Sequence, residues 1–268
     1  MSLAPLLKIE GLSVTYHGTT RPSLRDVSLQ LQEKKRLAII GESGSGKSTL
    51  ARCIAGLLPR GARTEGQIVW NGDRDKSSNP LFPTRGRDIA YVFQDPSASL
   101  NPVLTIGEQV AEAARRHLRL TRKQAYTHAR DLLAEVQLPN PEALLSAYPH
   151  QISGGQRQRV AIAAAISAAP KILIADEATS ALDTITQAAI TRLLDRLVDA
   201  NGMTLIFITH DIALASGLAD EIAVFQSGQL VESGKARGVL SHPTSDDTKR
   251  LLSSHLDLTT PPLVRRAS

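Results

Sequence analysis

The sequence predicts an α/β fold with a mainly parallel core sheet, a small antiparallel β subdomain and an inserted helical subdomain. Short apolar runs alternate with helical stretches, a pattern typical of parallel strands covered by helices on both faces. Two early segments alternate apolar and polar residues, as half-buried antiparallel strands do. Residues 94–160 have a helical pattern instead, and we expect them to form the insertion.

The first third of the chain is mostly strand. The predicted strands in this part cover residues 7–16, 27–32, 36–40, 66–72 and 89–93. The run "RLAII" at 36–40 stops at a glycine, as a buried parallel strand would. A helix is expected over 47–58, closed by Pro59 and Gly61, and the polar stretch 73–87 is expected to form a surface loop.

The remainder begins with helices and returns to strands. Predicted helices cover residues 104–118, 121–137, 184–200 and 211–218, and predicted strands cover 171–176, 204–209, 221–225 and 227–234. Thr121 and Gln124 have the spacing of a capping box, and Asn140 with Pro141 opens a further short helix. We therefore expect one domain over 6–240, with its core at 6–93 and 161–240 and the helical subdomain at about 94–160. Residues 241–268 are expected to form a loose polar tail.

Composition sets broad limits on the function. The 268 residues are 42% hydrophobic but only 3% aromatic, and the formal net charge is +5. This charge fits an anionic partner such as a nucleotide, a nucleic acid or a membrane surface, although charge alone favours a mildly basic soluble protein. The single cysteine, Cys53, excludes an internal disulfide. We expect no signal peptide at the start, and the longest apolar run is too short to span a bilayer.

A phosphate-binding loop is predicted at "GESGSGKST", residues 41–49. The segment fits G-x-x-x-x-G-K-[ST], follows a predicted strand and opens a predicted helix, which is the context that the motif requires. Glycines let the backbone curl so that its N–H groups converge on phosphate oxygens, Lys47 supplies charge and the Ser48 hydroxyl suits Mg²⁺. An ordinary glycine turn is the alternative, and the context argues against it. The predicted contacts are Gly41, Glu42, Ser43, Gly44, Ser45, Gly46, Lys47, Ser48 and Thr49.

Two carboxylates follow the apolar strand "ILIAD". Ligands bind just beyond the carboxyl ends of parallel strands, so Asp176 is expected to hold Mg²⁺ there. Glu177 follows at once and is expected to orient or deprotonate an attacking water. Without the loop at 41–49, a solvated acidic turn would explain this pair equally well.

Three further residues stand at predicted strand ends. His210 ends a strand at the sheet edge expected to carry Lys47 and Asp176, and we expect it to contact the terminal phosphate. Gln94 ends the strand "IAYVF" and can reach Mg²⁺ or water with its amide. Tyr16 ends the first strand pair and is expected to stack on a base, although a strand-end tyrosine is often simply packed.

A second site suited to anions lies at Ser153, Gly154 and Gly155, at the start of a helical run. Taken in order, Tyr16, the loop at 41–49, Gln94, "ISGGQ", "ILIADE", "SALD" and His210 resemble the ATP-binding subunit of an ABC transporter. The resemblance extends from about residue 6 to about residue 240. It implies a P-loop NTPase fold and an ATPase that uses ATP and Mg²⁺.

The resemblance also implies a purpose for the second site. In ABC ATPases two nucleotide-binding domains face each other head to tail, and each ATP is held by the loop of one and the Ser-Gly-Gly of the other. Ser153, Gly154, Gly155 and Gln156 would then hold the ATP of a partner, and Asp183 of "SALD" would contact the partner across the same interface. The dimer would close with ATP and open after hydrolysis.

Finer resemblances concern "VFQDPSASLNP" (92–102), "AYPHQISGGQRQRVAIA" (147–163) and "GLLPRGARTEGQIVWNG" (56–72). These are similar to ATPases of the peptide and nickel importer group, which implies transport of peptides, nickel or a metal-chelate. The implied location is peripheral, at the cytoplasmic face of the inner membrane. The implied partners are a second ATPase (a different chain or a copy of this one), membrane permease subunits and, indirectly, an external substrate-binding protein; no nucleic acid is expected. The permease is expected to dock on the helical insertion near residues 94–108.

Two alternatives compete with an importer. One is a mechanical ABC ATPase that acts on nucleic acid or ribosomes, supported by the basic run "RRHLRLTRK" at 115–123, although a solvated helix face explains that run more simply. The segment between 95 and 152 is short and lacks the sustained heptads of a long coiled coil. The other alternative is an ABC exporter subunit, because the ATPase core does not reveal the direction of transport.

Overall fold

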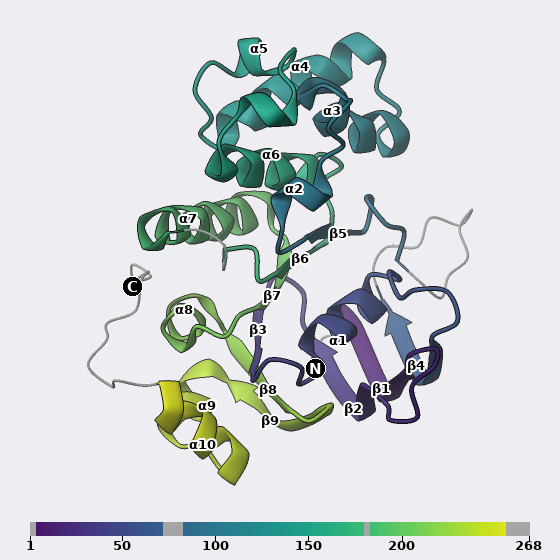
Figure 1. Ribbon diagram of the computed structural model, residues 1–268, viewed down its shortest axis with the longest axis vertical. Helices are drawn as coiled ribbons and strands as arrows, with labels where there is room; N and C mark the ends of the chain where they lie inside the picture. Colours follow the sequence, from purple (N-terminus) through teal and green to yellow (C-terminus); the bar gives the residue numbers. More distant parts are fainter. Residues whose placement is uncertain (1–3, 72–82, 180–182, 256–268) are drawn as a thin grey trace. The chain divides into compact units, whose positions relative to one another are not determined.

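The computed structural model describes residues 4–71, 83–179 and 183–255. The chain divides into two compact units, which we call unit 1 and unit 2 (Figure 1). Unit 1 comprises Met1–Pro83 and Gly202–Ser268, and unit 2 comprises Thr84–Asn201. The predicted helical subdomain at 94–160 falls inside unit 2, and its exact boundaries remain a prediction.

Unit 1 contains a three-stranded antiparallel sheet in the order β2-β1-β4. These strands are β1 (Leu7–Thr15), β2 (Leu24–Leu31) and β4 (Arg63–Trp70). Along β1 the side chains of Leu7, Ile9, Leu12 and Val14 are buried while their neighbours are partly exposed. This is the alternation expected of a sheet with one covered face, and it corresponds to the predicted antiparallel subdomain.

The second sheet region of unit 1 joins four strands, with β3 between β7 and β8 and with β9 beyond β8. Their bounds are β3 (Arg36–Gly41), β7 (Thr204–Ile208), β8 (Glu221–Gln226) and β9 (Gln229–Lys235). β3 runs parallel to both neighbours and is buried at every residue, whereas β8 and β9 form an antiparallel hairpin. The helices of unit 1 are α1 (Lys47–Ile54), α8 (Ile212–Leu218), α9 (Ala236–Ser241) and α10 (Asp246–His255).

Unit 2 combines a parallel strand pair with the helical part of the chain. Strand β5 (Ile89–Val92) pairs in parallel with the fully buried β6 (Ile172–Asp176). The helices are α2 (Pro96–Ser99), α3 (Ile106–His117), α4 (Arg122–Glu135), α5 (Pro141–Leu144), the 3₁₀ helix η1 (Pro149–Gln151), α6 (Gly154–Ile166) and α7 (Thr184–Asn201). Helix α6 packs against α2, α3, α4 and β5, so it lies at the centre of this part.

Most predicted elements are found close to their predicted bounds. The capping box of Thr121 and Gln124 is confirmed at the start of α4. The helix predicted over 47–58 instead ends at Ile54, because Gly56 adopts a left-handed conformation with φ 66° that closes it earlier. Most of the predicted loop at 73–87 lies outside the described residues.

The expected loose tail is wrong for part of its length. Residues Asp246–His255 form α10, in which Leu251 and Leu252 are 8% and 5% exposed. The preceding Thr244 and Ser245 donate backbone hydrogen bonds to the Glu232 carboxylate on β9. These contacts attach the segment to unit 1. Within the described ranges, no helix is long and apolar enough to cross a membrane.

Candidate functional site

The predicted phosphate loop connects the end of β3 to the start of α1 in unit 1. Gly41 has φ 148°, and a Cβ there would lie 2.1 Å from the carbonyl oxygen of Phe225 on the neighbouring strand. Gly46, the N-cap of α1, has φ 102°, and a Cβ there would lie 2.7 Å from the carbonyl oxygen of Ser23. Only glycine fits both positions, so the loop conformation depends on these two residues.

Lys47 lies folded back over this loop. The side chain is 5% exposed, and its Nζ donates to the carbonyl oxygens of Gly41 at 2.9 Å and Glu42 at 2.7 Å. Ser45 is 3% exposed, and its Oγ is buried with no hydrogen-bond partner in the part of the chain that the structure describes. A buried ammonium and a buried, unpaired hydroxyl in one short loop fit an anionic group such as phosphate.

Two other predicted residues belong to unit 1. The Tyr16 hydroxyl lies 3.1 Å from Oγ1 of Thr49, the residue that follows Ser48 in the first turn of α1. Tyr16 therefore lies beside this turn. His210 is exposed and follows β7, which pairs in parallel with β3. The carboxyl ends of paired parallel strands meet at one edge, so His210 and the loop occupy the same edge of this sheet.

The predicted carboxylates belong to unit 2, at the carboxyl ends of β5 and β6. Asp176 is 4% exposed and accepts a hydrogen bond from the Tyr91 hydroxyl at 2.6 Å. Glu177 accepts one from Nε2 of Gln94 at 3.0 Å. Glu177 has φ 46°, an uncommon conformation for a residue other than glycine. The parallel pairing of β5 and β6 thus brings Gln94 and both carboxylates together.

Tyr91 was missed by the sequence analysis. It lies on β5 opposite Ile174 of β6, and its ring is 4.6 Å from that of Phe93 between centroids. The only signal in the sequence is a hydroxyl-bearing residue inside the apolar run "IAYVF". A buried carboxylate needs a donor, and Tyr91 supplies one to Asp176.

The predicted second anion site also lies in unit 2, at the start of α6. Ser153 is the N-cap of α6 and forms a capping box with Gln156. Its Oγ accepts a hydrogen bond from the backbone N–H of Gln156 at 3.3 Å, and Oε1 of Gln156 accepts one from the backbone N–H of Ser153. A Cβ on Gly155 would lie 3.2 Å from Cγ2 of Thr186 on α7. The first turn of α6, including Gly154, is therefore close to the first turn of α7.

Asp183 caps that turn of α7. Its carboxylate accepts from the backbone N–H groups of Ile185 and Thr186 and from the Thr186 hydroxyl at 2.6 Å. The hydrogen bond from the Thr186 side chain, together with the backbone bonds, lowers the pKa of Asp183. The capping bonds alone account for an aspartate at this position, without a contact to a partner cassette. The other residues of "SALD", 180–182, lie outside the described residues.

The site residues therefore form two groups, each described within its own unit. Unit 1 holds Tyr16, the loop at 41–49 and His210, and unit 2 holds Gln94, Ser153–Gln156, Asp176, Glu177 and Asp183. In the described part, no group of three or more His, Cys, Asp or Glu side chains could hold a metal ion.

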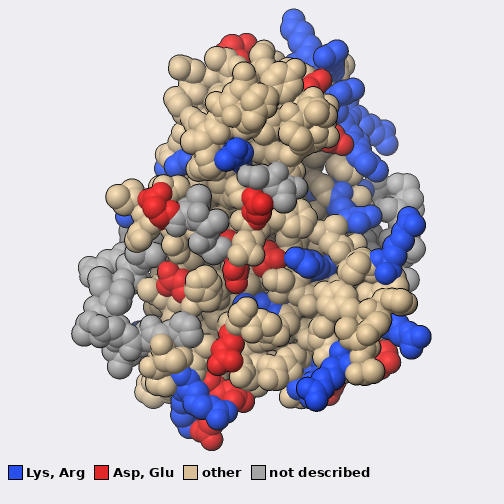
Figure 2. Space-filling view, viewed as in Figure 1, with Lys and Arg blue, Asp and Glu red and all other residues tan. Residues whose placement is uncertain are grey.

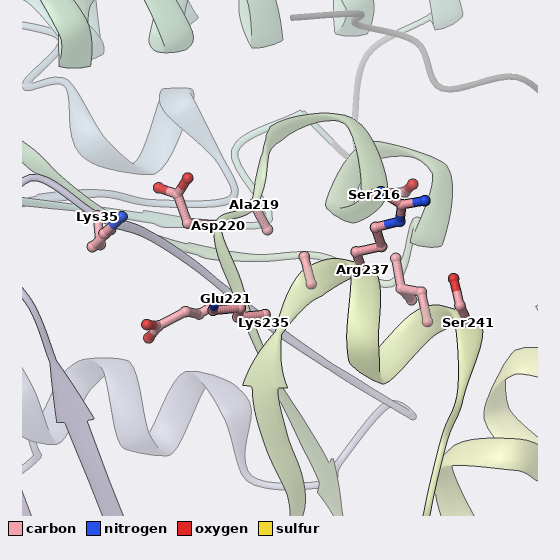
Figure 3. A pocket seen from close by; sticks show the side chains of 10 residues that line it. Lys35, Ser216, Ala219, Asp220, Glu221, Lys235, Arg237 and Ser241 are labelled. Atoms are coloured by element: carbon pink, nitrogen blue, oxygen red, sulfur yellow. The ribbon is translucent and has the colours of Figure 1, made fainter.

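A separate pocket of unit 1 does not belong to the phosphate loop (Figure 3). It lies where β3 and β8 begin, whereas the loop follows the end of β3. Asp220, which lines the pocket, accepts a hydrogen bond from the backbone N–H of Arg36 at 2.9 Å. This bond gives the carboxylate a structural role. The pocket is lined by Lys35, Ser216, Ala219, Asp220, Glu221, Lys235, Ala236, Arg237, Leu240 and Ser241.

Comparisons with known proteins identify the family of this chain. The ABC transporter family model matches residues 24–180. A glutathione import ATP-binding protein of Salmonella choleraesuis is 40% identical over 93% of this chain, and a peptidoglycan transport ATP-binding protein of Agrobacterium fabrum is 42% identical over 93%. The chain spans 42% and 47% of the length of these two relatives. A putative peptide import ATP-binding protein of Brucella melitensis is 42% identical over 96% of this chain and 79% of its own.

Solved structures similar to this chain are also ABC cassettes. A dimeric ATP-binding cassette in a post-hydrolysis state with ADP and phosphate has a TM-score of 0.73 and 31% identity, over 87% of this chain and 99% of its own. A cassette from Clostridium perfringens, part of an ABC transporter complex, has a TM-score of 0.73 and 27% identity, over 95% of this chain and 96% of its own. These likenesses confirm the predicted fold class. By sequence and by fold, this chain belongs to the ABC transporter family.

Proposed function

We propose that this chain binds and hydrolyses ATP as the energy-supplying subunit of a membrane importer with a peptide-type cargo. The observation that carries the proposal is the loop at 41–49, where buried Lys47 and the unpaired Oγ of buried Ser45 fit a phosphate group. The relatives described above are named for glutathione, peptidoglycan and peptides, which favours a peptide-type cargo over nickel or a metal-chelate.

The residues of the two groups supply the chemistry that ATP hydrolysis needs. Lys47 and the loop N–H groups would bind the phosphates, and the oxygens of Ser48, Asp176 and Gln94 are ligands of the kind that Mg²⁺ prefers. Bound Mg²⁺ would neutralise charge on the phosphates. Glu177 would accept the proton of the attacking water, with its carboxylate oriented by the bond from Gln94 at 3.0 Å.

A dimer would complete each site. The Ser153 cap holds the first turn of α6 in a fixed geometry, in which the N–H groups of Gly154 and Gly155 precede the first intrahelical donor, Arg157. Such N–H groups bind anions well, and we propose that they contact the terminal phosphate of an ATP held by a partner cassette. A cassette that is 31% identical to this chain has been solved as a dimer. The partner would be a different ATPase chain or a second copy of this one.

We further propose that the dimer works at the cytoplasmic face of the inner membrane. Permease subunits would dock on unit 2 near residues 94–108, which begin at Gln94 and reach into α3. Movement of Gln94 with the nucleotide state would then be passed to the permease as rigid-body rotation. An external binding protein would supply the cargo.

One experiment tests the proposed ATP binding and hydrolysis. Wild type, Lys47→Ala and Glu177→Gln are compared for ATP binding and for ATP turnover, with Lys8→Ala as a control that removes an exposed lysine paired with Glu10. Lys47→Ala should weaken ATP binding roughly 10- to 150-fold, the value of a hydrogen bond to a charged group. Glu177→Gln should retain binding and lose turnover by about 10²–10⁴-fold.

Three outcomes would contradict parts of the proposal. Normal turnover by Glu177→Gln in its full complex would remove Glu177 as the base. Turnover that rises on adding ribosomes or DNA, rather than reconstituted permease, would favour the mechanical ATPase. Cargo leaving rather than entering reconstituted vesicles would favour an exporter.

A further inference from the structure

A cluster of basic side chains lies where α3 ends and α4 begins in unit 2. It consists of Arg115, Arg116, Arg119, Arg122 and Lys123, and we call it the basic tip. All five residues are exposed. In the space-filling view, Lys and Arg side chains gather along one edge of the helical part of the chain (Figure 2).

The basic tip accounts for the whole positive charge of the chain. The chain has 31 lysines and arginines and 26 acidic residues, so the 26 basic residues outside the tip balance the acidic residues. Residues 115–123 contain no acidic residue. A formal charge of this size, concentrated in nine residues, produces a strong local potential for anions.

Nearby carboxylates do not neutralise the tip. Within the described residues, none of the five cations forms an ion pair, and Glu112, one turn earlier on α3, forms none either. Glu108 attracts Arg122 only at a distance, because its carboxylate is held by the backbone N–H and the hydroxyl of Thr105. An ordinary solvated helix is different: on α7, Arg192 and Arg196 alternate with Asp195 and Asp199.

An apolar side chain stands among the charges. Leu118 is 43% exposed and lies between Arg116 and Arg119, at the C-cap of α3. Apart from the half-buried His117, the nearest aromatic ring in sequence is that of Tyr126, which is covered by the guanidinium of Arg122 at 5.7 Å. Single-stranded nucleic acids are bound by open aromatic platforms, whereas basic residues around an exposed leucine suit a layer of anionic headgroups above acyl chains.

We propose that the basic tip binds anionic phospholipid headgroups, with Leu118 entering the interfacial layer. The proposal rests on the proposed function, which brings this chain to a membrane next to a permease. The tip would add an electrostatic contact with the bilayer to the contact with the permease. Turnover of ATP does not depend on it, so the two proposals can fail separately.

The test measures partition of the full chain, without nucleotide, onto sedimented vesicles of phosphatidylcholine with or without 30% phosphatidylglycerol. The variant Arg115→Gln/Arg116→Gln is compared with Arg192→Gln/Arg196→Gln, which removes the same charge from the exposed face of α7 in unit 2. Each basic residue near an anionic surface strengthens binding about five-fold. The variant Arg115→Gln/Arg116→Gln should therefore weaken partition onto anionic vesicles about 25-fold. The second pair should change it by less than about two-fold. Arg115→Lys/Arg116→Lys should restore most of the partition, because charge is retained.

Several results would overturn the proposal. Equal partition onto vesicles with and without phosphatidylglycerol would exclude recognition of anionic headgroups. Equal losses for the two glutamine pairs would reduce the effect to net charge. Tighter binding to duplex DNA than to anionic vesicles at the same salt, lost in Arg115→Gln/Arg116→Gln, would assign the tip to nucleic acid instead.

Discussion

The side-chain amide of Gln94 donates a hydrogen bond to the carboxylate of Glu177, with 3.0 Å between Nε2 and Oε2. The two residues are 83 positions apart in the sequence and are brought together by the parallel pairing of β5 and β6. The bond engages one oxygen of the carboxylate and restricts the orientation of the side chain. If Glu177 is the base, as proposed above, Gln94 positions it.

Replacing Gln94 with alanine should lower ATP turnover by about ten-fold or more while ATP binding changes little. The reason is that the amide positions Glu177, whereas the phosphate loop lies in unit 1. Steady-state kinetics would show the loss in kcat rather than in KM. The matched control is Gln67→Ala, which removes another amide–carboxylate bond, of 2.7 Å to Glu10 on the antiparallel sheet. A rise in KM with unchanged kcat would contradict a positioning role.

Tyr91→Phe should raise the Mg²⁺ concentration that gives half-maximal ATP turnover. The change removes only the hydroxyl that donates to Asp176 at 2.6 Å and leaves the ring contact with Phe93. Loss of such an outer partner commonly costs 10- to 100-fold in metal affinity or activity. Titration of Mg²⁺ at fixed ATP measures the shift, and Tyr126→Phe on α4 is the control. An unchanged Mg²⁺ requirement would show that Asp176 needs no help from Tyr91.

Ser153→Arg should leave ATP binding by this chain's own loop intact and should block ATP-driven association with the partner cassette. A bulky cation at the N-cap removes the capping bond to Gln156 and fills the space in front of Gly154 and Gly155. In a Glu177→Gln background, size-exclusion chromatography with ATP and the natural partner should show a dimer that Ser153→Arg abolishes. Thr121→Arg, at the cap of α4, is the control for helix capping alone. If Ser153 proves to contact the nucleotide held by its own Lys47, the shared site is wrong.

The sequence predicts some parts of this molecule well because local rules determine them. The phosphate loop requires glycine at Gly41 and Gly46 for backbone reasons, and those reasons can be recognised from the motif and its strand–helix context. Tyr91 and Asp176 are 85 positions apart in sequence, and their bond depends on the register of β5 and β6, which no local pattern reveals. Helix α10 was missed because its apolar contribution is mainly Leu251 and Leu252 in a polar segment.

Cys53 should react slowly with thiol reagents in the folded chain and rapidly after unfolding. The residue is 6% exposed on α1, and burial raises the pKa of its thiol to about 11, so the reactive thiolate is scarce at neutral pH. Labelling with a chromogenic disulfide at pH 8 should follow global unfolding in urea. Nucleotide should slow it further, because α1 begins at Lys47. Rapid labelling of the native chain would show that α1 opens locally.

Acid should detach the C-terminal helix before the rest of unit 1 unfolds. Burial alone would raise the pKa of Glu232, but hydrogen bonds from Thr244 and Ser245 outweigh it, and the net effect is a lowered pKa. A carboxyl group with a lowered pKa in the folded state stabilises that state above its unfolded pKa, near 4.5, and loses the effect as the pH falls through the folded value. Glu232→Gln should cost on the order of 1 kcal/mol at pH 7 and should remove this acid transition. Hydrogen exchange of the α10 amides between pH 7 and pH 3 measures it, with Glu65→Gln on β4 as the control, and α10 protection that is equal in Glu232→Gln and wild type at pH 7 would refute the link.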